Sequence, residues 1–272
     1  MLNYFPKRIV CLTDETTEML YLLGEEDRIV GISGFTVRPP RARKEKPKVS
    51  AFTSAKIGKI IDLKPDLVLG FSDLQAEIAV DLIKKGISVH IFNQRSVEEI
   101  FQMILMLGSM VGCQEKAENW INEHRLKIET IKKHASKMKI NPKVYFEEWN
   151  DPIITGIQWV SELIEIAGGV ECYPEYSKQN LAKNRIVADP LDVVQRDPDI
   201  IIGSWCGRKF RPENVEKRDG WENVTAVKNK QVFEIKSANI LQPGPAALSD
   251  GLDQIKAIID NWYKVTNSTS MD

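Results

Sequence analysis

The stretch QEKAENWINEHRLKIETIKKHASKMK, from Gln114 to Lys139, contains neither proline nor glycine and predicts one long helix. Its apolar residues recur at steps of three and four, which places them on one face that can be buried. At 1.5 Å per residue, about 25 residues span about 37 Å, enough to cross a small domain. The apolar face consists of Ala117, Trp120, Ile121, His124, Ile128, Ile131, Ala135 and Met138.

The residues before this helix alternate between strand and helix signals. Such alternation is typical of a mostly parallel sheet covered by helices. We therefore predict an N-terminal α/β lobe over residues 1–112 and a linking helix over 113–140. The expected strands of this lobe lie at 9–12, 28–32, 67–71 and 88–92, and the expected helices at 15–23, 54–63, 73–85 and 96–110.

The same alternation resumes after the helix and predicts a C-terminal α/β lobe over residues 141–272. The sequence RDPDIIIG at 196–203 has the same pattern as LKPDLVLG at 63–70, so the two lobes are expected to be structurally alike. The tail from Lys264 is polar and is expected to fray. The expected strands lie at 143–147, 199–203 and 231–235, and the expected helices at 158–167, 190–196 and 245–262.

The overall composition indicates a globular protein with no nucleic-acid-binding surface. Of the 272 residues, 37 are Lys or Arg and 38 are Asp or Glu, and no helix carries a basic stripe. The apolar run from Ile9 to Leu12 is too short for a signal peptide, and no stretch reaches the roughly 18 apolar residues of a membrane span. The sequence as written therefore predicts a cytoplasmic protein, and the alternative is a periplasmic or cell-surface protein whose leader has been removed.

The cysteines and histidines do not form a metal-binding pattern. Cys11, Cys113, Cys172 and Cys206 are widely separated and lack the close pairs of zinc sites, so free thiols in a reducing compartment are expected. His90 lies in an expected strand and His124 on the apolar helix face, which favours packing over metal ligation. No metal site is predicted.

Aromatic residues gather in or beside the predicted strand-end loops, where α/β proteins bind their ligands. Each ring alone is typical of a protein interior, but three tryptophans in or beside loops need a partner surface. A bulky ligand would supply that surface. The residues are Phe35, Phe52 and Phe71 in the first lobe and Trp149, Trp159 and Trp205 in the second.

Other residues near strand ends allow a catalytic hypothesis. Glu147, Glu148 and Asp151 could form a metal or acid/base site, or they are exposed acids near a turn before Pro152. Cys206 could be a nucleophile or a soft metal ligand, but no histidine with a matching role is identifiable. Beyond these residues, the segment Gln242-Pro-Gly-Pro precedes the last helix, whose free N–H groups could hold an anionic or carbonyl group.

Several short segments, in their order along the chain, are similar to a known family. They are Val30-Gly-Ile, Arg38-Pro-Pro, Val49-Ser, the 63–69 segment LKPDLVL, Glu148-Trp-Asn-Asp-Pro, Gly156, the 159–169 segment WVSELIEIAGG, Trp205-Cys-Gly and Pro243-Gly-Pro. The chain resembles the helical-backbone, two-lobed solute-binding proteins that serve ABC importers of cobalamin, haem and iron chelates. The resemblance is strongest to the cobalamin-binding branch and covers nearly the whole chain.

The resemblance implies two Rossmann-like lobes joined by a single long backbone helix, with a ligand cleft between the lobes. It implies a non-enzymatic protein that needs no cofactor and binds cobalamin or a related corrinoid between aromatic walls. The positions that match the family's cleft are Phe35, Arg38, Phe52, Phe71, Trp149, Trp159, Trp205, Cys206, Arg208 and Gln242.

Two functional questions stay open on the sequence. Importer-coupled relatives present a glutamate on each lobe to the ABC permease, whereas Gly58 and Leu191 stand at those positions here. A stand-alone cytoplasmic corrinoid binder is therefore as consistent with the sequence as an importer component. The alternative functions are a binder of haem, an iron-siderophore or another metal chelate, and an enzyme that uses Glu147, Glu148, Asp151 and Cys206 on a metal-bound substrate.

Overall fold

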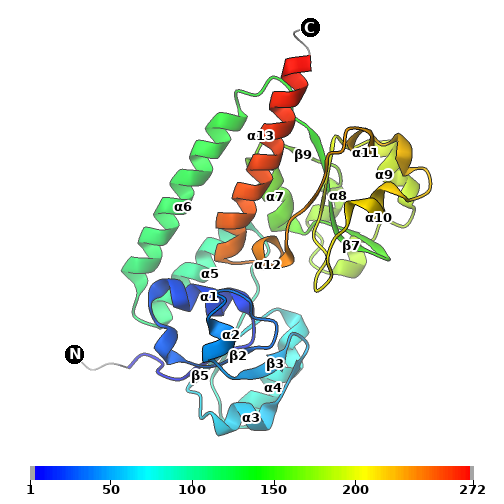
Figure 1. The fold of residues 1–272 in the computed structure, drawn as a ribbon. Coiled ribbons are helices and arrows are strands. Elements are labelled where there is room, and N and C mark those ends of the chain that lie inside the picture. Colours follow the sequence, from blue (N-terminus) through cyan, green and yellow to red (C-terminus); the bar gives the residue numbers. More distant parts are fainter. Residues whose placement is uncertain (1–3, 270–272) are drawn as a thin grey trace. The chain divides into compact units, whose positions relative to one another are not determined.

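The computed structural model describes residues 4–269, and the chain divides into two compact α/β units (Figure 1). Unit 1 comprises Met1–Gln94 and Glu98–Glu123, and unit 2 comprises Arg95–Val97 and His124–Asp272. The predicted fold class is therefore confirmed. For the domain limits, we propose those predicted above, which treat the linking helix as a separate element.

Unit 1 is built on a six-stranded sheet within the described residues. The strand order is β4-β3-β2-β1-β5-β6, and every neighbouring pair is parallel except β3 and β4. All five residues of β5 are buried, which explains its unbroken apolar sequence. The strands are β1 (Ile9–Cys11), β2 (Ile29–Ser33), β3 (Lys48–Ala51), β4 (Ser54–Ala55), β5 (Leu67–Phe71) and β6 (Val89–Phe92).

The helices of unit 1 connect these strands. Helix α1 ends at Gly24, whose φ of 76° belongs to the left-handed region that glycine adopts easily. One core cluster of unit 1 contains Val10, Val49 and Val68 from three strands and Ile60 from helix α3. The helical segments are α1 (Asp14–Leu23), η1 (Glu26–Arg28), α2 (Ala42–Glu45), α3 (Ile57–Asp62), η2 (Asp73–Gln75), α4 (Ala76–Lys84) and α5 (Val97–Met110).

One predicted helix of unit 1 is wrong at its start. The sequence predicted a helix over 54–63, but Ser54 and Ala55 form the short strand β4, and helix α3 begins only at Ile57. Ser54 and Ala55 pair with Ala51 and Ser50 of β3 in a tight antiparallel turn. This pairing covers part of the outer edge of β3, which would otherwise expose unpaired backbone groups.

The linking helix α6 (Gln114–Ala135) is continuous over 22 residues, four fewer than the predicted stretch (Figure 1). Its first half belongs to unit 1 and its second half to unit 2. Ala117, Ile121, Ile128, Ile131 and Ala135 are buried, as the apolar pattern predicts. Trp120 and His124 on the same face are half-buried.

Unit 2 contains a five-stranded sheet within residues 4–269. Its main order is β11-β10-β7-β8, and β9 pairs with the start of β7. β8 is antiparallel to β7, and the other pairs are parallel. The sequence predicted neither β8 nor β9, and it placed the end of β7 three residues too early. The strands are β7 (Lys143–Asn150), β8 (Ile153–Thr155), β9 (Val170–Glu171), β10 (Ile200–Gly203) and β11 (Val232–Glu234).

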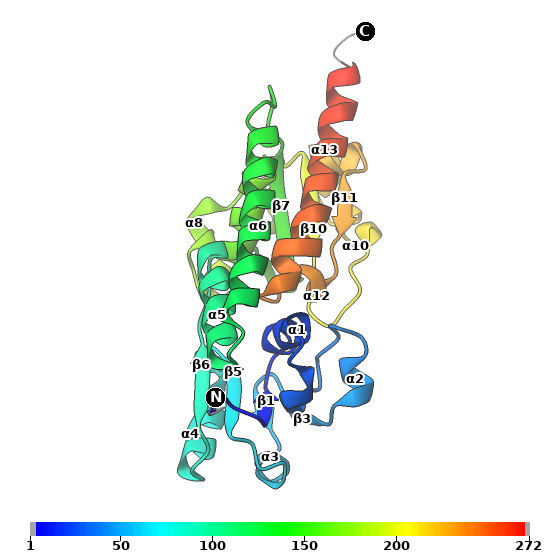
Figure 2. The same cartoon turned by 90° about the vertical axis from the view of Figure 1, so that its left-hand side faces the viewer.

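The helices of unit 2 include a long C-terminal helix beside the second half of α6 (Figures 1 and 2). Lys127 Nζ lies 2.7 Å from Asp253 Oδ2, and His134 Nε2 lies 3.3 Å from Asp260 Oδ1. The two contacts are seven residues apart on each helix, so the two helices run parallel. The helical segments are α7 (Gln158–Ile166), α8 (Pro174–Ser177), η3 (Ala182–Arg185), α9 (Pro190–Arg196), α10 (Pro212–Glu216), η4 (Trp221–Asn223), α11 (Thr225–Lys228), α12 (Ser237–Ile240), η5 (Ala247–Gly251) and α13 (Leu252–Thr269).

The predicted final helix over 245–262 begins where expected, at Pro245, but extends beyond its predicted end. After its first two residues it contains the π-helical turn η5 and continues as α13 to Thr269, so the polar segment from Lys264 to Thr269 is helical and not frayed. The part of that tail beyond residue 269 lies outside the described residues. No helix within residues 4–269 is both long and apolar enough to cross a membrane.

Replacing Gly203 or Gly58 with alanine compares a crowded position with an open one. A Cβ added to Gly203 would lie 1.9 Å from the ring of Phe210, whereas one added to Gly58 in helix α3 meets nothing within 4 Å. We expect Gly203→Ala to lower the free energy of unfolding by about 1–3 kcal/mol because the buried ring must move. We expect Gly58→Ala to leave it unchanged or to raise it by up to about 1 kcal/mol. Urea denaturation measures both, and equal effects would contradict the packing described here.

Candidate functional site

The carboxyl ends of the strands in unit 1 carry the predicted phenylalanines. Phe35 follows β2 and is 62% exposed, Phe52 follows β3 and is half-buried, and Phe71 ends β5 and is buried. The buried Gln75 connects two of these ends, because its Nε2 donates to Phe52 O at 2.8 Å and its Oε1 accepts from Phe71 N at 2.9 Å. Sequence reasoning missed Gln75, since a glutamine near a helix start carries no distinctive signal.

Arg38 lies on the loop after β2 and is held by an acidic residue of helix α1. Its Nε lies 2.7 Å from Glu18 Oε1, and its side chain is 27% exposed. This ion pair borders a hollow of about 300 Å³ with mainly apolar walls. The hollow is lined by Glu18, Tyr21, Leu22, Arg38, Pro39, Pro40 and Arg41.

The first turns of α1 contain three buried acids, Asp14, Glu15 and Glu18. Burial raises the pKa of Glu15 to about 7, although Thr13 Oγ1 donates a hydrogen bond to its Oε1 at 2.6 Å and opposes the rise. Burial likewise raises the pKa of Asp14, against hydrogen bonds from Thr36 and the backbone of Val37. The sequence analysis did not single out these acids, because acids in the first turn of a helix are common.

The strand ends of unit 2 are organised around Glu147, a residue of β7 with no exposed surface. Its Oε1 accepts from Trp205 Nε1 at 3.0 Å and from Arg218 Nη2 at 2.8 Å. Its Oε2 accepts from Tyr145 OH at 2.9 Å and from Arg218 Nη1 at 2.6 Å. Four donors therefore satisfy one buried carboxylate, and the two bonds from Arg218 form a bidentate pair.

The surroundings of Glu147 shift the pKa values of its partners. The pKa of Tyr145 is well above its usual value, first because the phenol is buried and then because the Glu147 carboxylate opposes its ionisation. Burial alone would lower the pKa of Arg218, but its hydrogen bonds to Glu147 reverse this effect and raise it. Both shifts have the same origin, since the Glu147 carboxylate opposes a negative charge on Tyr145 and favours the positive charge on Arg218.

The loop after β10 places Trp205 against this carboxylate and Arg208 above two indole rings. Trp205 is 3% exposed and packs edge-on against Phe210, with ring centroids 5.0 Å apart. The guanidinium carbon of Arg208 lies 5.7 Å from the ring centroid of Trp149 and 6.0 Å from that of Trp205. Arg208 itself is exposed, so its charged group contacts the rings while it remains open to solvent.

The remaining predicted residues of unit 2 lie on different elements. Trp159 is in the first turn of α7, where it is 3% exposed and donates from Nε1 to Ile240 O at 2.8 Å. Cys206 is exposed and directly follows Trp205. Gln242 is half-buried, two residues after the end of α12.

The protein itself supplies a hydrogen-bond partner for each of the three tryptophans. The sequence argument held that large rings in or beside loops need a partner surface, and Trp159 and Trp205 find theirs in Ile240 and Glu147. Trp149 is half-buried at the end of β7, and its Nε1 donates to Asp151 O at 2.9 Å. That these rings contact a ligand remains a prediction, and Trp149 has the most surface free for such contact.

Three buried polar side-chain atoms at the ends of β7, β8 and β10 lack a hydrogen-bond partner among the described residues. They are Asn150 Oδ1 at the end of β7, Thr155 Oγ1 at the end of β8 and Ser204 Oγ directly after β10. Buried polar atoms are nearly always satisfied, by protein, water or ligand. All three lie on β7 or on a strand that pairs with it, or directly after such a strand.

Two of the three acids of the catalytic hypothesis, Glu147 and Glu148, form structural contacts. Glu147 is fully paired, and Glu148 Oε2 lies 2.6 Å from Nη1 of Arg185, a buried residue that also donates to Thr155 O. Within residues 4–269, no group of three His, Cys, Asp or Glu side chains could hold a metal ion. None of the four cysteines forms a disulfide within residues 4–269.

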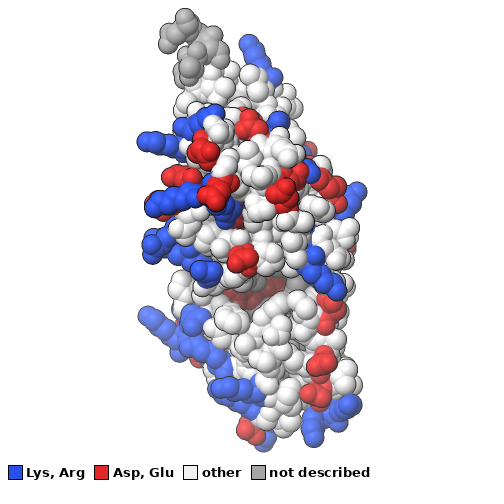
Figure 3. All heavy atoms as spheres, turned by 90° about the vertical axis from the view of Figure 1, so that its right-hand side faces the viewer, with Lys and Arg blue, Asp and Glu red and all other residues white. Residues whose placement is uncertain are grey.

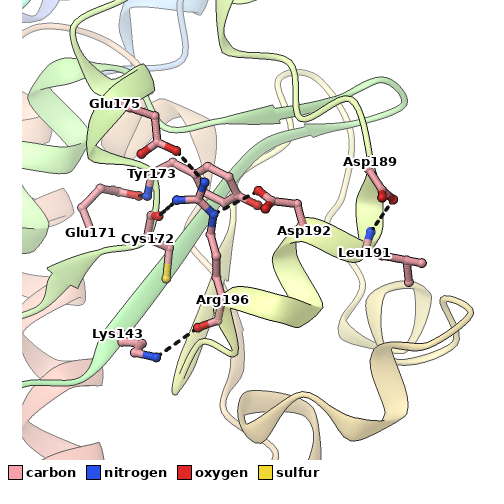
Figure 4. Close-up of polar contacts among 9 residues, drawn as sticks. All are labelled: Lys143, Glu171, Cys172, Tyr173, Glu175, Asp189, Leu191, Asp192 and Arg196. Carbon is pink, nitrogen blue, oxygen red and sulfur yellow. Dashed lines mark hydrogen bonds and ion pairs between the residues drawn. The ribbon is translucent and has the colours of Figure 1, made fainter.

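The predicted docking position Leu191 lies on α9 beside a cluster centred on Arg196 (Figure 4). Arg196 contacts Asp192 at 3.0 Å and Glu175 at 2.5 Å, donates to Cys172 O, and lies 4.0 Å above the ring of Tyr173. Asp189 accepts a hydrogen bond from the backbone N–H of Leu191 at 2.9 Å and caps the helix. The acids nearest to Leu191 in sequence therefore have structural roles within unit 2.

Charged side chains of both signs reach the molecular face drawn in Figure 3. This mixture matches the total of 37 basic and 38 acidic residues. A surface of this kind lacks the single-sign field that steers a protein to nucleic acid.

Two α/β units, each with ligand-type loops at the carboxyl ends of parallel strands and joined by one long helix, define the class III fold of periplasmic binding proteins. The chain belongs to the periplasmic binding protein family, whose family model matches residues 9–238. Members of this family are non-enzymatic solute-binding proteins. The enzymatic alternative based on Glu147, Glu148, Asp151 and Cys206 is therefore wrong.

Relatives in other bacteria align with nearly the whole chain. The uncharacterised ABC transporter substrate-binding lipoprotein YvrC of Bacillus subtilis is 28% identical over 272 residues, covering 95% of this chain and 82% of that protein. The vitamin B12-binding protein of Vibrio cholerae is 25% identical over 259 residues, covering 92% of this chain and 88% of that protein.

Solved structures share the fold at lower identity. A possible iron-binding protein from Staphylococcus epidermidis has a TM-score of 0.78 at 22% identity, covering 93% of this chain and 98% of that one. The vitamin B12-binding protein BtuF of Vibrio cholerae has a TM-score of 0.76 at 21% identity, covering 95% and 98%. The haem-binding protein RhuT from Roseiflexus has a TM-score of 0.77 at 19% identity, covering 93% and 99%.

The Glu147 network predicts a large difference between two charge-removing substitutions. Glu147→Gln leaves Arg218 partly buried without its counter-charge, so we expect the free energy of unfolding to fall by about 3 kcal/mol. Glu129→Gln removes a solvent-exposed pair with Lys132 and should change it by less than about 1 kcal/mol. Chemical denaturation of both variants measures the difference. A Glu147→Gln variant as stable as Glu129→Gln would contradict a buried, ionised pair.

The raised pKa of Glu15 predicts a pH-dependent effect on stability. The folded-state pKa of about 7 lies above the ordinary value of 4.5, so the folded protein binds this proton more tightly and loses stability as pH rises from 4.5 to 7. Glu15→Gln removes this loss. We expect the variant to gain stability relative to the wild type between pH 5 and pH 8, by about 1.4 kcal/mol per unit of pKa difference. Urea denaturation at the two pH values measures it, and a pH-independent difference would contradict the assignment.

Proposed function

We propose that this protein is the substrate-binding component of an ABC importer and that its ligand is cobalamin or a related corrinoid. The observation that carries the proposal is the alignment of 92% of the chain with the vitamin B12-binding protein of Vibrio cholerae. A structure of the same fold, BtuF, is likewise a vitamin B12-binding protein. No cofactor is needed for such a role, since the ligand is the cargo.

The proposed ligand contacts come from the strand-end loops of each unit. In unit 1 the ring of Phe35 is exposed and not part of the core, so a ligand can contact it without disturbing the packing of the protein. Arg38, Phe52 and Phe71 lie on the same edge of the sheet. Aromatic faces suit a large, flat macrocycle, and a few polar groups suit its amide side chains. In unit 2 the proposed contacts are Trp149, Trp159, Trp205, Cys206, Arg208 and Gln242.

Haem and iron chelates are the second candidate ligands. Relatives of the same fold include a haem-binding protein and a possible iron-binding protein. Of the two cations among the proposed contacts, Arg38 is already paired with Glu18. Only Arg208 then remains to neutralise a charge on the ligand, so most charges of a highly anionic ligand would stay unpaired. This favours a corrinoid, which carries few charges.

An ABC permease is the proposed macromolecular partner, because the YvrC relative is an ABC transporter substrate-binding lipoprotein. Gly58 and Leu191 are both exposed, but neither carries the charge that importer-coupled relatives present. We propose that any docking relies on other residues of α3 and α9. This role places the protein outside the cytoplasm, in contrast to the location predicted from the sequence, and cell fractionation distinguishes the two.

The ligand proposal is tested by equilibrium dialysis with cobalamin and a matched pair of variants. Phe35 is 62% exposed and Leu126 on α6 is 71% exposed, so replacing either with alanine removes exposed apolar surface and leaves the core intact. We expect the wild type to retain cobalamin, Phe35→Ala to bind it at least tenfold more weakly, and Leu126→Ala to bind it unchanged. Such a loss corresponds to about 1.4 kcal/mol.

Failure of the wild type to retain cobalamin, combined with retention of haem or a ferric siderophore, would overturn the corrinoid proposal in favour of the second candidate. Equal binding by Phe35→Ala and the wild type would remove Phe35 from the proposed contacts.

A further inference from the structure

The loop after β10 carries an unusual concentration of unpaired positive charge. Three exposed cations lie here. Arg208 and Lys209 stand between the buried residues Trp205 and Phe210, and Arg211 directly follows Phe210. Among residues 4–269, none of the three forms an ion pair with a carboxylate. Elsewhere in this unit, Arg185, Arg196 and Arg218 are each paired with a glutamate or an aspartate.

Arg208 differs from the other two cations of this loop because its position is defined by aromatic rings. Its guanidinium lies 5.7 Å from the ring centroid of Trp149 and 6.0 Å from that of Trp205. Contact with an aromatic face holds a guanidinium without using its N–H donors. The donors of Arg208 therefore remain available for a bidentate contact with an oxyanion.

The ring of Trp205, one of the two that contact Arg208, is held in place by the buried ion pair between Glu147 and Arg218. Trp205 Nε1 donates to Glu147 Oε1, and Arg218 binds both oxygens of that carboxylate. Because Arg218 already neutralises Glu147, the carboxylate does not compensate the charge of Arg208. The loop is further anchored by Phe210, whose ring packs against Trp205 and whose backbone N–H donates to Glu234 Oε1 at 3.0 Å.

From this arrangement we infer that Arg208 is an oxyanion-recognition residue, which binds a phosphate or carboxylate group carried by the ligand. Glu147 and Arg218 act on it as positioning residues through Trp205. The unsatisfied atoms Asn150 Oδ1 and Ser204 Oγ, on the ends of β7 and β10, add polar groups at the same edge of the sheet. The inference rests on the proposed function, and it adds that the preferred ligand carries at least one negative group.

Two pairs of probes separate the sources of the oxyanion. Cobalamin carries a phosphodiester that cobinamide lacks, and haem carries two carboxylates that its dimethyl ester lacks. We expect the wild type to prefer the anionic member of at least one pair, and Arg208→Gln to weaken binding of that member by about tenfold or more. Binding of the member without the anion should change less than about twofold.

The matched control is Arg211→Gln, which removes an exposed arginine near the same loop that contacts no described aromatic ring. It should bind every probe as the wild type does. Affinity for the preferred anionic probe should also fall with rising salt in the wild type and lose most of this dependence in Arg208→Gln. Circular dichroism and thermal unfolding confirm that both variants remain folded, as exposed positions predict.

The outcomes distinguish this inference from the proposed function. If only the cobalamin pair responds to Arg208→Gln, the inference holds with phosphate as the recognised group, and if only the haem pair responds, it holds with carboxylate. If the wild type retains a probe and Arg208→Gln binds all four as the wild type does, the inference is wrong while the proposed function stands. Retention of no probe by the wild type would overturn both.

Discussion

The arrangement of unit 2 depends on satisfying one carboxylate that has no contact with water. An unpaired buried charge costs several kcal/mol, so Glu147 can occupy the end of β7 only if donors from other parts of the chain converge on it. They come from the same strand, from the loop after β10 and from the segment before η4. The first two segments also pair directly, as the neighbouring strands β7 and β10, and the bidentate contact from Arg218 attaches the third segment to them.

The extent to which the sequence revealed the fold depended on the range of the interactions involved. Uninterrupted apolar strands such as β5 and the helical pattern of α6 were predicted correctly, because burial and periodicity are local properties. Strand β4 and the short strand β8 were not, because a two- or three-residue strand is defined only by its partner across the turn. The π-helical turn near the start of the last helix was also not predicted, since its sequence fits a regular helix equally well.

The candidate site was less accessible to prediction than the fold. The strand ends were correctly expected to carry Phe35, Trp149 and Trp205, but the pattern of residues could not reveal which rings the protein itself would cover. Trp159 and Trp205 are covered through hydrogen bonds to Ile240 and Glu147, which are 81 and 58 residues away in sequence. Contacts at such separation leave no trace in local periodicity. The family resemblance supplied part of this missing information, because it indicated which loops carry the ligand-binding positions.

The parallel packing of α13 beside the second half of α6 has a consequence for the order in which the protein can be assembled. Unit 1 has its full set of residues once Glu123 has been synthesised, whereas unit 2 needs the buried side chains of Leu252, Ile255 and Ile259 near the end of the chain. On the ribosome, the first unit can fold while the second still lacks its closing helix. Until α13 has been synthesised, unit 2 therefore lacks three apolar side chains of its core, and the surface that they cover stays exposed to solvent.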